Sequence, residues 1–104
     1  MDRKLMPALF VGHGSPMNVL EDNKYTRLWT TLGETLPKPK AILVISAHWY
    51  TQGTYITAMT HPKTIHDFYG FPPELYQIEY PAKGSIGLVA LIEDLIDPMK
   101  LKLD

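Results

Sequence analysis

The sequence contains no cysteine. This absence excludes disulfide bonds, thiolate metal sites and a cysteine nucleophile, so any metal ion would have to be held by imidazole, carboxylate or water. Neither sign of charge dominates, because 10 Lys and Arg stand against 11 Asp and Glu with no like-charge run or basic stripe. We therefore expect neither nucleic acid nor an anionic membrane surface as a partner.

Long apolar runs are also missing. The apolar stretch near the start is short and is interrupted by Pro7 and then Gly12, which is too little for a signal peptide or a membrane span. We expect a soluble cytoplasmic protein, and the lack of cysteine fits a reducing compartment. The length of 104 residues, 45% of them hydrophobic, predicts one α/β domain over residues 1–104 with a modest core.

Apolar runs alternate with helical patterns along the chain, which predicts a mostly parallel sheet with flanking helices in three layers. The predicted strands are residues 8–12, 41–46 and 54–59, and residues 99–103 alternate like a half-buried or edge strand.

Two segments have helical periodicity. The first runs from Glu21 to Leu36 and is stopped by the Pro37–Pro39 segment; the second is capped by Ser85 and ended by Asp97–Pro98. Their apolar stripes are Tyr25, Leu28, Trp29, Leu32 and Leu36 in the first, and Leu88, Leu91, Ile92 and Leu95 in the second.

Between the third predicted strand and the last helix, residues 63–83 are rich in aromatics and prolines and lack periodicity. We interpret this segment as an ordered loop. A loop of this length inside a compact domain is usually functional, so we expect a lid or the wall of a pocket.

Two histidines follow the first two predicted strands. His13 lies in GHGSP, residues 12–16, and His48 lies in ISAHW, residues 45–49. Because parallel strands joined by one crossover end at the same edge of a sheet, both imidazoles are expected there, where open α/β sheets place their sites. The pair is a candidate metal site, although a single histidine near a strand end is more often structural.

A metal site of this type needs a third ligand, and no residue has a diagnostic spacing for that role. The candidates are Glu21, Asp22, His61, His66 and Asp67. Ser15 follows two glycines and could be a hydrolase nucleophile, but the nucleophile-elbow pattern is absent. We expect Ser15 to cap or brace its loop instead.

Three motifs in order carry a resemblance to a known family. They are GHGSP at residues 12–16, VISAHW at residues 44–49 and TIHDFYGFP at residues 64–72. Together they resemble the class III extradiol ring-cleaving dioxygenases, in the DOPA 4,5-dioxygenase-like branch. The resemblance covers about residues 6–81, and the chain looks like an amino-terminal portion of such a domain.

The resemblance implies that His13 and His48 are two of three ligands of a non-haem Fe(II), for which Zn(II) is a plausible replacement in the isolated protein. It implies a catechol such as DOPA and O2 as substrates, with His66 a candidate contact to the substrate. Family members supply a third ligand and an acid-base histidine from further chain, and after His66 this sequence has no histidine. The chain alone is therefore expected to be an incomplete family domain, inactive by itself and prone to form a homo-oligomer through its uncovered sheet.

Two other functions use the same residues. A zinc-dependent hydrolase would hold its metal with the same two histidines and activate water. A non-catalytic α/β module would act only in assembly, and replacing both histidines would then change neither metal content nor activity.

Overall fold

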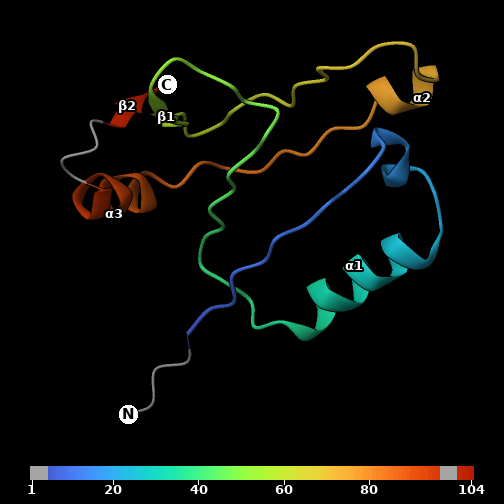
Figure 1. Cartoon of the computed structure of the whole chain (residues 1–104), viewed down its shortest axis with the longest axis horizontal. Helices are drawn as coiled ribbons and strands as arrows, with labels where there is room; N and C mark the ends of the chain where they lie inside the picture. The colour runs from blue at the N-terminus through green and yellow to red at the C-terminus, as the bar shows by residue number, and fades with distance from the viewer. Residues whose placement is uncertain (1–4, 97–100) are drawn as a thin grey trace. The chain divides into compact units, whose positions relative to one another are not determined.

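The computed structural model describes residues 5–96 and 101–104, and within it the chain divides into two compact units (Figure 1). One unit comprises Met1–Lys40 and His66–Ile78, and the other comprises Ala41–Ile65 and Glu79–Asp104. Each unit is described separately below. The expectation of a single domain over residues 1–104 stays a prediction.

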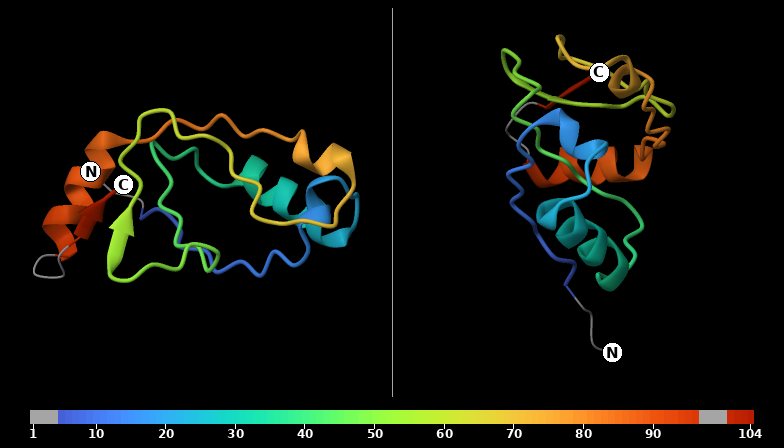
Figure 2. Two further views of the ribbon diagram at one scale, coloured as in Figure 1. Left: turned by 90° about the horizontal axis from the view of Figure 1, so that it is seen from above. Right: turned by 90° about the vertical axis from the view of Figure 1, so that its right-hand side faces the viewer.

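Among its described residues, the first unit has three helical elements. They are the 3-10 helix η1 (Pro16–Val19), the helix α1 (Lys24–Thr35) and the helix α2 (Pro73–Tyr76). Helix α2 contacts η1, and Figure 2 shows these two elements beside each other. Leu75 of α2 is 2% exposed and is the most deeply buried large side chain among the described residues.

Helix α1 confirms the predicted helix over Glu21–Leu36 but begins later, at Lys24. The cause is Asn23, whose side-chain oxygen accepts hydrogen bonds from the backbone N–H groups of Tyr25 and Thr26, both at 3.0 Å. Thr26 in turn accepts the Asn23 N–H at 2.9 Å, which completes a capping box. A cap of this kind stabilises a helix by about 1 kcal/mol.

The predicted apolar face of α1 is only partly covered. Trp29, Leu32 and Leu36 are half-buried, whereas Tyr25 and Leu28 are 56% and 55% exposed. The helix therefore covers only the carboxyl-terminal part of its apolar stripe within this unit.

The second unit contains a two-stranded parallel sheet and a helix. Strand β1 (Thr54–Ile56) pairs with strand β2 (Leu101–Leu103) in the register Thr54↔Leu101 and Ile56↔Leu103 (Figure 1). Asp104 extends the ladder, because its N–H donates to the Ile56 carbonyl at 2.9 Å. The predictions of a strand near 54–59 and of an edge strand near the end are confirmed for these residues, and residues 99 and 100 lie outside the described ones.

Helix α3 (Ile86–Ile96) confirms the second predicted helix. Ser85 caps it by accepting the Leu88 N–H at 3.2 Å. The buried residue is Val89, at 7% exposure, while Leu91 and Leu95 of the predicted stripe are 53% and 68% exposed. The predicted stop at residues 97 and 98 lies outside the described residues.

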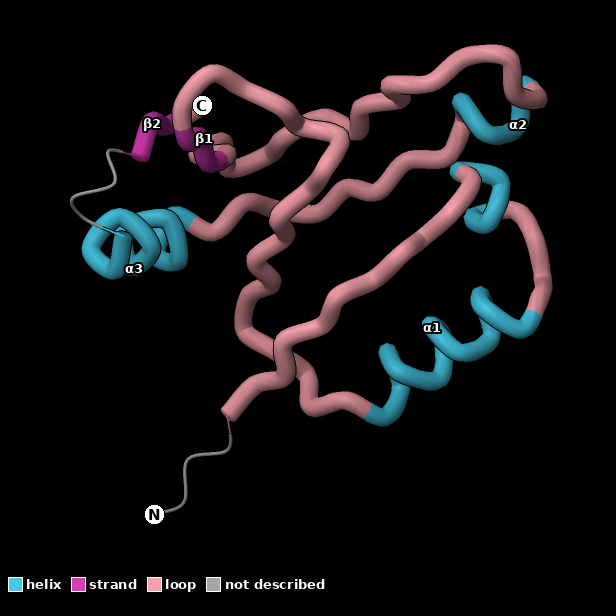
Figure 3. Tube along the Cα trace, viewed as in Figure 1, coloured by secondary structure: helices cyan, strands magenta, loops and turns pink. Residues whose placement is uncertain are grey.

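The predictions of strands at residues 8–12 and 41–46 are wrong for this structure, which draws both segments as loops (Figure 3). An apolar run becomes a strand when a neighbour accepts its backbone hydrogen bonds and helices cover its faces. Within the described residues the sheet has two strands, and Phe10 and Ile45 are 104% and 93% exposed.

The coarser fold prediction is confirmed: the structure has helices and a small parallel sheet, as an α/β protein does. Three layers are not seen among the described residues. The predicted ordered loop at 63–83 is confirmed apart from α2, and Thr64 closes it by accepting the Tyr80 N–H at 2.9 Å. No helix in the described part of the chain has the length and apolar character needed to span a bilayer.

Candidate functional site

His13 lies on a tight loop before η1. Gly14 has a φ of 66°, a left-handed conformation that favours glycine, and it turns the chain directly after the histidine. The His13 Nδ1 lies 2.9 Å from the Gly14 carbonyl oxygen. Because a carbonyl oxygen only accepts, the neutral ring carries its proton on Nδ1 and its lone pair on Nε2. This is the arrangement in which metal-binding histidines commonly occur.

The loop is also held by its side chains. Ser15 Oγ accepts the Met17 N–H at 3.1 Å and caps η1, which confirms the expected capping role of this serine. Asn18 Nδ2 donates to the His13 carbonyl at 2.7 Å. These two bonds hold the backbone at the His13 carbonyl and in the turn that follows it.

His48 belongs to the second unit. It lies on a turn in which Ser46 Oγ accepts the His48 N–H at 3.1 Å and the Ser46 carbonyl accepts the Trp49 N–H at 3.3 Å. The Trp49 ring packs at 6.4 Å from the Tyr55 ring of β1. His48 is exposed on this turn, as the sequence predicts, and since His13 lies in the other unit, their meeting at one metal stays a prediction.

His66 has a different environment. Its Nε2 lies 2.7 Å from the Ile78 carbonyl oxygen, so the neutral ring carries its proton on Nε2, the opposite tautomer to that of His13. The ring also lies edge-on to Phe68 at 6.0 Å and at 6.3 Å from Tyr76. Phe71 completes this aromatic cluster through an edge contact with Phe68 at 5.3 Å.

The aromatic cluster, made of His66, Phe68, Phe71 and Tyr76, explains why the 66–78 segment is ordered without regular structure. The His66 bond to Ile78 joins its two ends and the rings fill its interior. His66 therefore has a clear structural role, and its predicted contact with substrate is not tested by this geometry.

The remaining candidates for a third ligand are engaged elsewhere. Asp22 forms an ion pair with Arg27 at 2.7 Å, Glu21 accepts a hydrogen bond from Asn23 at 3.4 Å, and His61 Nδ1 lies 3.2 Å from Thr60 Oγ1. Asp67 is exposed. Across residues 5–96 and 101–104, no group of three or more His, Asp or Glu side chains is placed to hold a metal ion.

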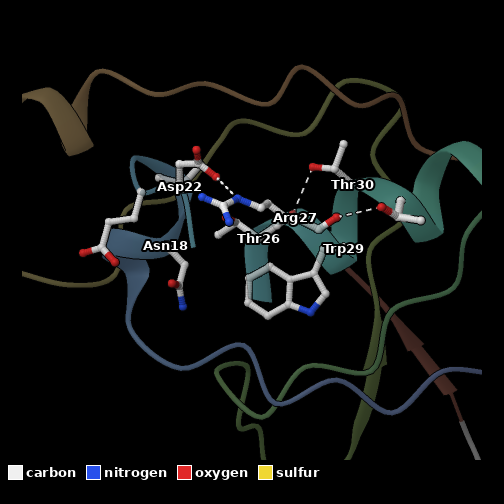
Figure 4. Close-up of a pocket in the computed structure, with 9 residues that line it drawn as sticks. Asn18, Asp22, Thr26, Arg27, Trp29 and Thr30 are labelled. Carbon is white, nitrogen blue, oxygen red and sulfur yellow. Dashed lines mark hydrogen bonds and ion pairs between the residues drawn. The ribbon is translucent and has the colours of Figure 1, made fainter. Parts of the chain in front are cut away.

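A hollow of about 730 Å³ lies on α1 and the preceding segment (Figure 4). Its size is within the range of small-molecule sites, but it holds neither His13 nor His66. Figure 4 shows the Asp22–Arg27 ion pair among the residues that line it. The lining residues are Asn18, Val19, Glu21, Asp22, Thr26, Arg27, Trp29, Thr30 and Thr31.

The donor set fits a metal of the iron or zinc type. Imidazole suits both ions, and the His13 ring is held in the tautomer that a ligand through Nε2 requires. That His13 and His48 are two of the three ligands of such a site stays a prediction, and the third ligand is unassigned. Asn18 is the residue that sequence reasoning missed; an asparagine a few residues after a glycine-flanked histidine was the available signal, since such side chains often bond nearby backbone.

The chain is similar to the corresponding part of several longer proteins named as dioxygenases. No family model matches it. It is 60% identical over 104 residues to the 4,5-DOPA dioxygenase extradiol of Escherichia coli K12, covering 100% of this chain and 38% of that protein.

Two further relatives agree with this result. The 4,5-DOPA dioxygenase extradiol of Beta vulgaris is 43% identical over 90 residues, covering 84% of this chain and 34% of that protein. A protein named dioxygenase tasH, from Hapsidospora irregularis, is 36% identical over 97 residues, covering 83% of this chain and 30% of that protein. The resemblance found in the three motifs is thus confirmed, and the chain spans less than two fifths of each of these relatives.

Proposed function

We propose that this chain forms part of a metal-dependent extradiol dioxygenase that opens a catechol ring with O2. The observation that carries the proposal is the 60% identity over all 104 residues to a 4,5-DOPA dioxygenase extradiol. A DOPA-like catechol is the substrate that the names of the relatives favour. The activity requires a third metal ligand and an acid-base group, and no residue of this chain is assigned to either role. The chain alone is therefore expected to be inactive.

His13 and His48 are the residues proposed to hold the metal. Fe(II) is the cofactor expected for activity, with Zn(II) a plausible occupant of the isolated protein. When bound, the metal would bring the catechol and O2 together and transfer electron density between them. Within this chain, the Gly14 carbonyl holds His13 Nδ1, and the Nε2 lone pair would be the one that binds the metal.

The aromatic cluster is proposed to line the catechol site. Its phenyl and phenol rings offer faces and edges on which a flat ring can stack. His66 would contact the substrate through Nδ1, because its Nε2–H donates to the Ile78 carbonyl. A neutral Nδ1 accepts a hydrogen bond, and a catechol hydroxyl can donate one.

The test is metal analysis of the chain purified without chelator, beside the His13→Ala/His48→Ala double variant. We expect iron or zinc in the parent chain and its loss in the double variant. The control is Glu34→Ala, because Glu34 is an exposed residue of α1 outside the candidate ligands, and its replacement should leave the metal content unchanged. Absence of metal from both the parent and the double variant would contradict a site formed by His13 and His48 in this chain.

Oxygen uptake separates the dioxygenase from the hydrolase. With the chain alone, catechol should not be consumed, and turnover by the purified 104-residue chain would show that its own residues complete the site. Zinc dependence with hydrolysis and no oxygen uptake would favour the hydrolase. Unchanged metal content and activity in the double variant would favour the assembly module.

We further propose that the chain forms a homo-oligomer. Ile42, Val44 and Ile45 are 69%, 73% and 93% exposed, and adjacent β-branched residues of this kind pair readily with another chain. Light scattering at micromolar concentration should give a mass above that of the 11.8 kDa monomer. Val44→Lys should shift the mass toward the monomer, whereas a parent chain that is already monomeric would contradict the proposal.

A cytoplasmic location is proposed from the absence of cysteine, which suits a reducing compartment. Fractionation of cells that express the chain would test it, and recovery in a secreted fraction would contradict it.

A further inference from the structure

Asn18 connects the His13 loop to the start of α1. Its Nδ2 donates to the His13 carbonyl at 2.7 Å, and its Oδ1 accepts a hydrogen bond from Asn23 Nδ2 at 3.0 Å. Figure 4 shows Asn18 on η1 near the first turn of the helix. The side-chain amide of Asn18 therefore bonds to the His13 loop and to the cap of α1 at the same time.

The far end of this connection is firmly held. Asn23 caps α1 through its Oδ1, and in the capping box its backbone N–H donates to the Thr26 hydroxyl oxygen. Because the Asn23 amide is fixed by helix backbone, the Asn18 amide that bonds to it is fixed as well. The His13 carbonyl is thereby linked through two side chains to a twelve-residue helix.

Gly14 lies directly beside the Asn18 amide. A Cβ at this position would lie 3.4 Å from Asn18 Nδ2, in addition to the strain of its φ of 66°. The glycine after the histidine thus serves the turn, and the Asn18 amide packs directly against it.

We propose that Asn18 is a positioning residue that holds His13 in the conformation needed for metal binding. The proposal rests on the metal-binding role of His13 given above. The Asn18 bond fixes the His13 carbonyl and the Nδ1 contact fixes the ring, so together they hold the backbone and the side chain of one residue. An asparagine suits the task because an amide offers a donor and an acceptor in one plane, whereas alanine offers neither.

The test compares Asn18→Ala with Ser15→Ala in the full chain. Both variants remove a side-chain hydrogen bond from the same loop, but Ser15 bonds to the Met17 N–H and not to His13. Zn2+ is titrated while the His13 ring is followed by NMR. We expect about tenfold weaker zinc binding in Asn18→Ala, at the low end of the effect of groups that orient metal ligands. Ser15→Ala should change binding less than about twofold, as a substitution that leaves the His13 carbonyl bonded.

A second comparison shows whether the effect passes through His13. In the His13→Ala background, Asn18→Ala should cause no further loss of zinc binding, since the residue that it positions is gone. An equal loss in both backgrounds, or an equal loss in Ser15→Ala, would overturn the proposal by showing general loosening of the unit.

The His13 ring also gives a readout that does not need a metal. In the parent chain, at a pH where the ring is neutral, the NMR chemical shifts of the His13 ring nitrogens should show one tautomer, with the proton on Nδ1. In Asn18→Ala these shifts should show a mixture of the two tautomers, while the helical circular dichroism is unchanged. An unaltered tautomer would overturn the role of Asn18. If the parent chain binds no zinc, the proposed function fails for this chain and the tautomer measurement still decides the role of Asn18.

Discussion

Replacing Gly84 by alanine is expected to lower the free energy of unfolding by about 3 kcal/mol, the upper part of the range for overpacked positions. A Cβ at this position would overlap the Met59 carbonyl oxygen, which is backbone and cannot rotate away. Gly84 is also held close by its N–H, which donates to the Thr60 carbonyl at 2.9 Å. Urea denaturation followed by circular dichroism measures the change.

Gly87→Ala is the matched control. A Cβ at Gly87 would meet nothing within 4 Å, and the residue lies inside α3. This variant should stabilise the chain by at most about 0.5 kcal/mol, because alanine is the better helix former but Gly87 lies in the first turn of α3. Equal free energies of unfolding for the two variants would contradict the close backbone approach at Gly84.

Leu75→Ala is expected to cost about 3 kcal/mol, within the range for truncation of a buried leucine. Leu75 is 2% exposed on α2, and within the described residues only Val89 is comparably buried, at 7%. Since so little of the described chain is covered, one side chain carries a large share of the apolar burial in its unit. The measurement is the denaturation midpoint together with the slope of the transition.

The control for this prediction is Leu91→Ala, which makes the same chemical change at a residue that is 53% exposed. A loss below about 0.5 kcal/mol is expected there, as for most surface substitutions. A loss equal to that of Leu75→Ala would mean that Leu91 is covered in solution, which self-association would explain.

Local signals in the sequence were reliable guides to the helices. The periodicity that predicted a helix over Glu21–Leu36 and the Ser85 cap of the last helix depend on residues a few positions apart, and both helices formed. Helix α1 begins later than the periodicity predicts, because the capping box at Asn23 sets its start.

Strands depend on partners that are distant in sequence, and only some of the strand predictions were correct. The runs at residues 8–12 and 41–46 have the composition of buried strands but pair with no other strand within the described residues. By contrast, Leu101–Leu103 pairs with Thr54–Ile56, although no residue pattern in either segment identifies the other as its partner. Composition indicates a preference for burial, whereas pairing requires a neighbour.

For the candidate site, the sequence predicted the residue types and their local setting. His13 lies on a glycine turn and Ser15 caps η1, as expected. The direction of each imidazole could not be predicted, because it depends on which carbonyl each ring meets, Gly14 for His13 and Ile78 for His66. The Asn18 bond was missed for the same reason.

The pairing of β1 with β2 has a consequence for the order of folding. Thr54 and Leu101 are direct partners, and the whole of α3 lies between them in the sequence. Closing so long a loop costs more entropy than forming a helix turn, so α3 can form early while the sheet must form late. A single proteolytic cut between Ala58 and Ser85 would turn this closure into an association of two peptides, and the sheet would then depend on protein concentration.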